Sequence, residues 1–225
     1  MQQLQILDLS GSRIGDEGLA HLKGLGALQV LRLAHTRITD EGLAHLRGLS
    51  ALQTLDLTAT EVTGLGLVHL TGLKSLQELF LGENQIGTGE LAHLRNMKSL
   101  RVLSLRKTWL RSQGLANVAE LKKLEKLYLT GNPIDNSACA FLRNLEGLTE
   151  LALGATFVDD NGLQDLKDLK RLEVLVLALT KCTDAGLRHL EMMKGLKTLD
   201  LSQTGVTKAG VRRMRELCPS ADIRC

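Results

Sequence analysis

The sequence predicts an α/β fold, a right-handed solenoid in which a parallel β-sheet lines the concave side and short helices cover the convex side. Three observations predict it. A 24-residue pattern recurs without a gap, leucine fills the same positions of every copy, and the leucine spacing changes from two residues to three within each copy. Aromatic residues make up only 2% of the 225 residues. This composition favours a core of stacked, nearly identical layers.

The repeat divides the chain into nine consecutive units and a partial tenth. The second unit reads LQVLRLAHTRITDEGLAHLRGLSA and the eighth reads LEVLVLALTKCTDAGLRHLEMMKG. The units span residues 4–27, 28–51, 52–75, 76–99, 100–123, 124–147, 148–171, 172–195 and 196–219, and the C-terminal partial repeat spans 220–225. Because no unit could bury its leucines alone, we expect residues 1–225 to form a single domain.

The first half of each unit predicts a β-strand. In the first unit, alternation points Leu7 and Leu9 to one side, and Ile6, Asp8 and Ser10 to the other. Strands stacked in parallel lie about 4.8 Å apart, whereas packed helices need about 8–10 Å. The difference bends the stack into a horseshoe with the sheet on its inner side.

The second half of each unit predicts a short helix. Leu19, Leu22 and Leu25 lie three residues apart, and later units repeat this spacing. Aspartates come just before several of these helices, where a carboxylate can cap the first turn: Asp16, Asp40, Asp160 and Asp184. A glycine two residues later should let the start of the helix lie close to its neighbours: Gly18, Gly42, Gly66, Gly114, Gly162, Gly186 and Gly210.

The pattern LxxLxLxxTx(I/V)TDxGLxxLxxLxx resembles the leucine-rich-repeat family over residues 4–219. Threonine usually stands where the common form has Asn or Cys, and we expect it to hydrogen-bond the backbone of the turn. The position holds Thr36, Thr60, Thr108, Thr156, Thr180 and Thr204, with Asn84, Asn132 and Ser12 as exceptions. The TDxGL half is similar to Thr-type bacterial repeats and to ribonuclease-inhibitor-like repeats. The resemblance implies a solenoid whose concave face binds a partner.

The sequence predicts a different feature at each end of the chain. Ile223 and Cys225 occupy the inward strand positions of an unfinished tenth unit. Residues 1–3 supply no cap, so the first strand should have a bare N-terminal edge. Such an edge is typical either of a fragment of a longer protein or of a surface for self-association.

Composition and motifs argue against several classes of function. The net charge of +3 is too small to indicate a nucleic-acid partner, and no apolar run is long enough to insert into a membrane. Five histidines share one helical position, but their spacing does not suit a metal site: His21, His45, His69, His93 and His189. The chain contains no convincing catalytic or cofactor-binding motif, so we expect neither an enzyme nor a cofactor.

The four cysteines favour a reducing compartment such as the cytoplasm. Cys139 and Cys182 take apolar positions of the repeat, so we expect them to be small residues of the core. Cys218 and Cys225 either form a C-terminal disulfide or remain free thiols, and free thiols are the favoured interpretation.

The candidate binding residues concentrate in the middle units. Phe80, Tyr128 and Val176 take the same strand position of units four, six and eight, and Trp109 and Phe157 lie where the chain turns toward the helix. Nearby charges supply a polar rim: Glu83, Arg101, Arg106 and Lys107. Aromatic and arginine side chains are common energetic anchors of interfaces. A second, apolar patch either extends this surface toward the C-terminus or is covered by a missing segment; it comprises Val174, Val176, Ala178 and Leu179 with Ala152 and Ala155.

These features predict a non-catalytic module that binds a protein or peptide on its concave face. Two alternatives remain open. The chain could be the substrate-targeting portion of a larger enzyme, such as a ubiquitin-ligase component or a kinase, whose catalytic segment lies elsewhere. It could instead be a structural scaffold that assembles through the N-terminal edge strand.

Overall fold

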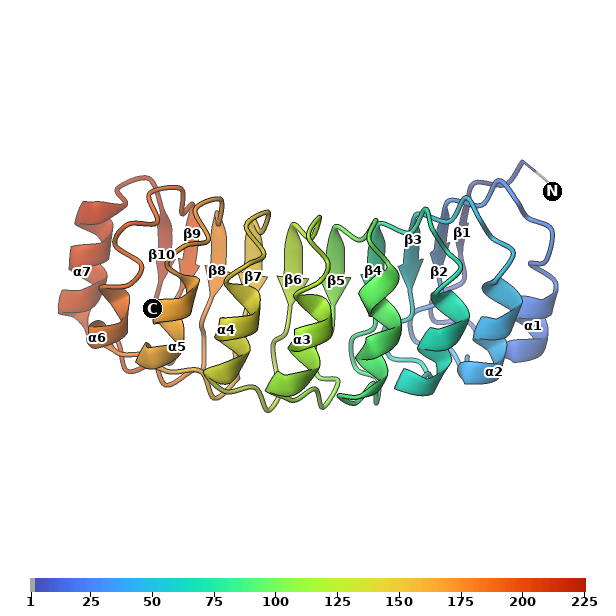
Figure 1. The fold of residues 1–225 in the computed structure, drawn as a ribbon, viewed down its shortest axis with the longest axis horizontal. Helices are drawn as coiled ribbons and strands as arrows, with labels where there is room; N and C mark the ends of the chain where they lie inside the picture. Colours follow the sequence, from blue (N-terminus) through green and yellow to red (C-terminus); the bar gives the residue numbers. More distant parts are fainter. Residues whose placement is uncertain (1–2) are drawn as a thin grey trace.

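A computed structural model describes residues 3–225 as ten short strands in one parallel sheet, with a helical segment after each of the first nine strands (Figure 1). The predicted N-terminal edge involves Met1 and Gln2, which lie outside the described residues. The strands are β1 Ile6–Asp8, β2 Val30–Arg32, β3 Thr54–Asp56, β4 Glu78–Phe80, β5 Val102–Ser104, β6 Lys126–Tyr128, β7 Glu150–Ala152, β8 Val174–Val176, β9 Thr198–Asp200 and β10 Asp222–Arg224.

The helical segments are a mixture of α-helices and 3-10 helices. The α-helices are α1 Asp16–Ala20, α2 Asp40–Leu43, α3 Leu115–Val118, α4 Ser137–Leu142, α5 Asp160–Leu166, α6 Asp184–Leu187 and α7 Lys208–Leu217. The 3-10 helices are η1 Ala44–Leu46, η2 Gly64–Leu70, η3 Glu90–Asn96 and η4 Ser112–Gly114. The helical layer covers one face of the sheet (Figure 1).

The sheet keeps one register throughout. Each strand pairs in parallel with the strand 24 residues away, so that Leu7 lies beside Leu31 and Leu31 beside Leu55. The order along the sheet is the order along the chain, from β1 to β10. The predicted fold class is therefore confirmed.

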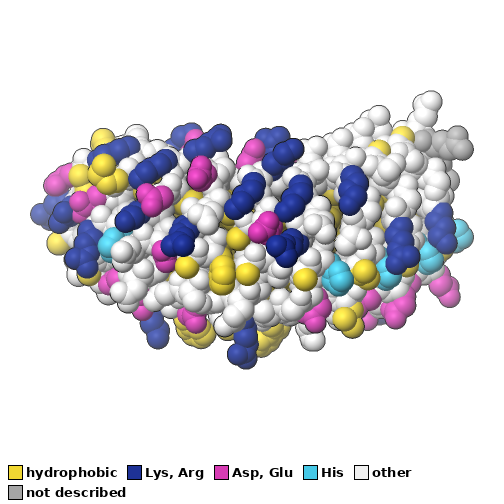
Figure 2. Space-filling model, in the orientation of Figure 1, with side chains coloured by type: hydrophobic (Ala, Val, Ile, Leu, Met, Phe, Trp, Pro, Cys, Tyr) yellow, Lys and Arg dark blue, Asp and Glu magenta, His cyan; other side chains and the backbone are white. Residues whose placement is uncertain are grey.

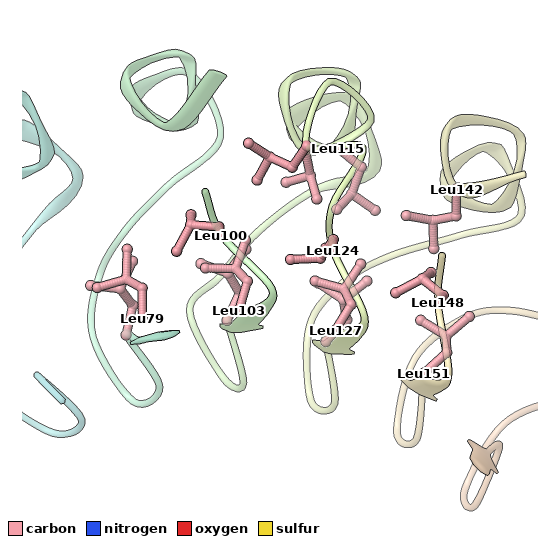
Figure 3. Close-up of a cluster of buried hydrophobic side chains, with 14 of the residues drawn as sticks. Leu79, Leu100, Leu103, Leu115, Leu124, Leu127, Leu142, Leu148 and Leu151 are labelled. Atoms are coloured by element: carbon pink, nitrogen blue, oxygen red, sulfur yellow. The ribbon is translucent and has the colours of Figure 1, made fainter. Parts of the chain in front are cut away.

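The core is a continuous stack of leucines between the sheet and the helices. Figure 3 shows Leu103 and Leu127 on adjacent strands and Leu115 above them from the helical layer. All three have no exposed surface. Each leucine thus packs against equivalent leucines of the neighbouring repeats, which explains why one residue type fills the core.

The turns after the strands are held by the predicted threonines. The hydroxyl of Thr156 donates to the carbonyl of Leu153 at 2.6 Å, and Thr36, Thr60, Thr108, Thr180 and Thr204 make the equivalent bond. Asn132 does more, because its amide donates to the carbonyls of Leu105 and Leu129 at 2.6 and 2.8 Å. The asparagine therefore ties its turn to the preceding repeat.

The expectation that the repeated aspartates cap their own helices was wrong. Asp40, Asp160 and Asp184 are the first residues of their helices, and the capping groups are the side chains just before them. For example, Thr183 accepts from the backbone N–H of Ala185 at 3.2 Å. The carboxylate of Asp160 instead accepts from Thr183, in the next repeat. The aspartates therefore join repeats rather than cap helices.

The repeated glycines allow this bond to form. A Cβ atom placed on Gly186 would collide with the carboxylate of Asp160, and one on Gly210 would collide with that of Asp184. Gly42 and Gly66 face Asp16 and Asp40 in the same way. The expected close approach at the helix starts is confirmed, and its cause is the aspartate of the preceding repeat.

The tenth strand forms as expected, with one correction. Ile223 is buried, but Cys225 is exposed rather than turned into the core. Cys139, Cys182 and Cys218 are buried, and all four cysteines are free thiols.

Candidate binding surface

The face of the sheet away from the helices carries a row of side chains that the core does not fix. At the last position of strands β4 to β8, the row reads Phe80, Ser104, Tyr128, Ala152 and Val176. Strands in a sheet lie about 4.8 Å apart, so Phe80 and Tyr128 stand about 10 Å apart with Ser104 between them. Ser104 is buried, whereas both rings are half-buried. Two aromatic side chains thus flank a short polar one.

Hydrogen bonds hold Tyr128 in place. Its hydroxyl donates to Oε2 of Glu150 at 2.6 Å, and Oε1 of the same carboxylate accepts from Lys126. Burial, followed by the hydrogen bond and the negative charge of Glu150, raises the pKa of Tyr128 above its ordinary value. Burial also opposes ionisation of Glu150, but the hydrogen bonds from Lys126 and Tyr128 outweigh it and lower the pKa of that carboxyl. The phenol is therefore a fixed, neutral group on this face.

Apolar side chains continue the row toward the C-terminal end. Val174 and Val176 are half-buried, Ala152 is buried, and Leu179 is 55% exposed. The surface from β4 to β8 therefore offers apolar contact area next to the Tyr128 network.

Glu83, Arg106 and Lys107 lie together just beyond the C-terminal ends of β4 and β5. Lys107 forms an ion pair with Glu83 at 3.2 Å, and all three side chains are exposed. Glu83 and Lys107 have positive φ angles of 61° and 51°. The equivalent residue has a positive φ in each of the first nine repeats, so the chain turns sharply at this point throughout the solenoid.

Arg101 lies apart from the other rim residues. It precedes β5, whereas Arg106 and Lys107 follow it, so the strand separates them by roughly 16 Å at 3.3 Å per residue. Its guanidinium is paired with Glu125 at 2.6 Å. The four rim residues predicted from the sequence therefore lie at two opposite edges of the sheet, with Arg101 where the strands begin and the other three where they end.

Trp109 and Phe157 form a second, separate group on the loops between strand and helix. They take the same position of repeats five and seven, and Pro133 takes it in repeat six. Trp109 is 73% exposed and Phe157 59% exposed. Lys181 lies 6.0 Å from the centre of the Phe157 ring, and Trp109 lines an open cavity of about 440 Å³ together with Gln85 and Gly87.

Sequence reasoning missed several members of these groups. Glu150 and Lys126 were overlooked because their link to Tyr128 depends on the strand register. Pro133 and Lys181 share the repeat position of Trp109 and Phe157, so comparing the same position in every unit would have found them.

Other kinds of site receive no support from the part of the chain that the structure describes. Figure 2 shows histidines in a row on the helical face, but no group of three metal-binding side chains occurs within residues 3–225. No helix in this range is long and apolar enough to cross a membrane.

Comparisons with known proteins identify relatives of this fold. The sequence profile described as leucine rich repeat matches residues 2–62 and 50–110. Internalin C2 of Listeria monocytogenes has a TM-score of 0.69 and 25% identity, and the match covers 92% of this chain and 82% of the internalin. No curated protein matches the sequence.

Two further solved structures share the fold. A leucine-rich-repeat protein of Leptospira interrogans has a TM-score of 0.58 and 20% identity, over 100% of this chain and 73% of that protein. The plant peptide hormone receptor RGFR1, solved in complex with RGF2, has a TM-score of 0.57 and 19% identity. That match covers 91% of this chain but only 37% of the receptor.

Proposed function

Because the chain belongs to the leucine-rich-repeat family, we propose that it is a non-catalytic module that binds a protein or peptide on the open face of its sheet. The observation that carries the proposal is the pair of half-buried aromatic side chains, Phe80 and Tyr128, on either side of Ser104. Aromatic side chains are common anchors of interfaces, and solenoids of this kind use extended surfaces for recognition.

The Tyr128 side chain is already held in place in the free protein, which supports this proposal. Glu150 already fixes the hydroxyl of Tyr128, so little side-chain freedom is left for a ligand to remove. The apolar residues that follow, including Val176 and Leu179, add contact area. Glu83, Arg106 and Lys107 supply charges at the edge where β4 and β5 end.

Trp109 and Phe157 belong to the same proposal as a second contact region. Their exposed rings lie on the loops at that edge, where a ligand crossing the sheet would leave it. Arg101 lies at the opposite edge, so we do not place it in this contact region.

The likeness to a peptide hormone receptor makes peptide binding compatible with the fold. At 19% identity the likeness concerns the fold alone, and the ligand of that receptor gives no guide to the ligand of this chain.

Partner capture from a lysate of the source organism tests the proposal. The wild-type chain is immobilised beside three variants: Phe80→Ala/Tyr128→Ala for the sheet, Trp109→Ala/Phe157→Ala for the loops, and Met192→Ala as a control. Met192 is a 70% exposed apolar residue on the helical side, so the control removes exposed apolar surface elsewhere.

We expect a protein that the wild type and the control retain and that the sheet variant loses. Loss with the loop variant as well would assign that region to the same interface. Equal capture by the wild type and both double variants would contradict the proposal.

A further inference from the structure

We infer that the solenoid has a second binding site, for a phosphate-type anion, in a basic cavity on the edge where the strands begin. The cavity has a volume of about 230 Å³. Its lining residues come from repeats five, six and seven: Arg101, Lys122, Lys123, Glu125, Gly147 and Arg171. This inference does not depend on the proposed function of the opposite edge and the sheet.

The charge of the lining is strongly unbalanced. Four cationic side chains face one carboxylate, Glu125, which is already paired with Arg101 at 2.6 Å. Within residues 3–225, Lys122, Lys123 and Arg171 form no ion pair. Like charges that gather without a counter-charge repel one another, and a bound anion would relieve that repulsion.

Three lysines near the cavity on the same edge are different, because acidic side chains neutralise them. The pairs are Lys98 with Glu120 at 3.6 Å, Lys170 with Asp168 at 3.7 Å and Lys197 with Glu173 at 2.7 Å. Figure 2 shows the wider band of Lys and Arg along the upper edge of the solenoid. The unpaired charge at the cavity is thus bounded on both sides, which favours a compact anion over a long polyanion such as a nucleic acid.

Gly147 makes room for the ligand. The last position of repeats five, six and seven holds Lys123, Gly147 and Arg171. Because the middle residue has no side chain, the two flanking cations border a hollow rather than a filled surface. The flanking repeats carry long side chains at this position, whereas a Cβ on Gly147 would lie 3.2 Å from the carbonyl oxygen of Leu124. The hollow therefore results from the residue type at one position.

A second hollow of about 570 Å³ adjoins the first. It shares Lys122, Gly147 and Arg171 with the cavity. Glu146, Asp168 and Lys170 complete the lining of the second hollow, so the excess of positive charge is confined to the first hollow and to the cations that the two share. This distribution suits a small anion. The guanidinium group of arginine and the ammonium group of lysine are the side-chain groups that bind phosphate oxygens most strongly. Inorganic pyrophosphate therefore serves as the simplest probe.

Isothermal titration calorimetry with pyrophosphate at low ionic strength tests the inference. We expect saturable binding to the wild type and a loss of affinity of about tenfold or more in Lys123→Gln/Arg171→Gln, since charge-assisted hydrogen bonds are lost. The matched control is Lys74→Gln/Lys194→Gln, which removes two charges from equivalent loops of repeats three and eight, outside the cavity. The control should bind as the wild type does.

A second variant, Gly147→Glu, places a carboxylate in the hollow and should abolish binding while thermal melting shows a folded protein. Failure of the wild type to bind pyrophosphate would overturn the inference. Equal weakening of both double variants would also overturn it, because the binding would then reflect overall charge. Binding to phosphatidylserine vesicles without binding to pyrophosphate would contradict the compact site as well, since the occupant would be a flat membrane surface.

Discussion

Asp160 and Thr183 are joined by two hydrogen bonds across the junction of the seventh and eighth repeats. One carboxylate oxygen accepts from the backbone N–H of Thr183 at 2.7 Å and the other from its hydroxyl at 2.6 Å. Asp16, Asp40 and Asp184 make the same pair of bonds to Thr39, Thr63 and Thr207. In repeats six and seven Asn136 and Asp159 replace the pair, so that the amide donates and the carboxylate accepts. A side-chain ladder therefore reinforces the sheet on its helical side.

Removing one rung should destabilise the solenoid. Asp160→Ala leaves the half-buried N–H and hydroxyl of Thr183 without their partner, and we expect a loss of about 1–3 kcal/mol in the free energy of unfolding. Urea denaturation measures this loss. Asp168→Ala is the control, because its carboxylate has only an exposed ion pair with Lys170 and should change stability by less than about 0.5 kcal/mol. Equal effects of the two variants would contradict the role of the ladder.

The glycines opposite the rungs should resist substitution. In Gly186→Ala the new methyl group would collide with the carboxylate of Asp160, and we expect destabilisation of about 1–3 kcal/mol by overpacking. Gly195→Ala is the matched control, since its nearest atoms lie at 3.6 Å and leave room for a methyl group. Thermal melting compares the two. The prediction fails if Gly186→Ala melts at the wild-type temperature.

The sharp turn after each strand offers a route to greater stability. Gln203 is exposed and has a φ of 57°, a conformation that costs a residue with a Cβ roughly 1–2 kcal/mol. Gln203→Gly should therefore raise the free energy of unfolding, by up to about 1 kcal/mol after the loss of chain entropy. Gly11 takes the same position with a φ of 69°, and Gly11→Ala should have the opposite effect. Urea denaturation measures the free energy of unfolding of both variants. If both substitutions raised it, or both lowered it, this explanation would be excluded.

Tyr128 should ionise only at strongly alkaline pH. Burial raises its pKa most, and the hydrogen bond and charge of Glu150 raise it further. It is the only tyrosine in the chain, so absorbance at 295 nm follows this group alone. Glu150→Gln should lower the observed pKa toward the ordinary value near 10 while leaving the burial contribution.

The raised pKa of Tyr128 also makes the free energy of unfolding fall as the pH rises through the alkaline range. Because the pKa of Tyr128 is raised on folding, its contribution is fully present below pH of about 10 and is lost as the pH rises toward the folded pKa. Because Tyr128→Phe has no phenol to ionise, its free energy of unfolding should fall less than that of the wild type as the pH rises over this range. A phenol that titrates near its ordinary pKa in the native protein would refute the proposed environment.

Thiol reactivity should distinguish the four cysteines. Burial raises the pKa of Cys139 to about 12 and that of Cys182 to about 11, so both remain protonated and unreactive at neutral pH. Cys218 is buried as well, whereas Cys225 is exposed. We expect one thiol to react with Ellman's reagent in the native protein and four in denaturant. Cys225→Ser should remove the fast phase, and rapid reaction of a second thiol would contradict the structure.

The leucine positions were enough to predict the strands, the helical layer and the parallel sheet, because burial requires an apolar residue at each of them. The role of Asp160 was not predictable in this way, since its partner Thr183 lies 23 residues away and the pattern does not show which side chain meets which. Arg101 and Arg106 are close in the sequence but lie at opposite ends of β5. The identity of Phe80 and Tyr128 as surface residues followed from strand alternation, whereas the hydrogen bond that fixes Tyr128 depends on a side chain of the next strand.

The constant register of the strands affects how the chain folds. Every strand pairs with strands 24 residues before or after it, so the sheet forms without closing any loop longer than one repeat. Such a chain can nucleate in any pair of neighbouring repeats and then grow outward from them in both directions. It also means that one whole repeat, such as residues 148–171, could be removed and the strands on either side would still meet in register, with Asn136 brought opposite Thr183. Solenoids of different length are therefore neighbours in sequence space, one 24-residue duplication or deletion apart.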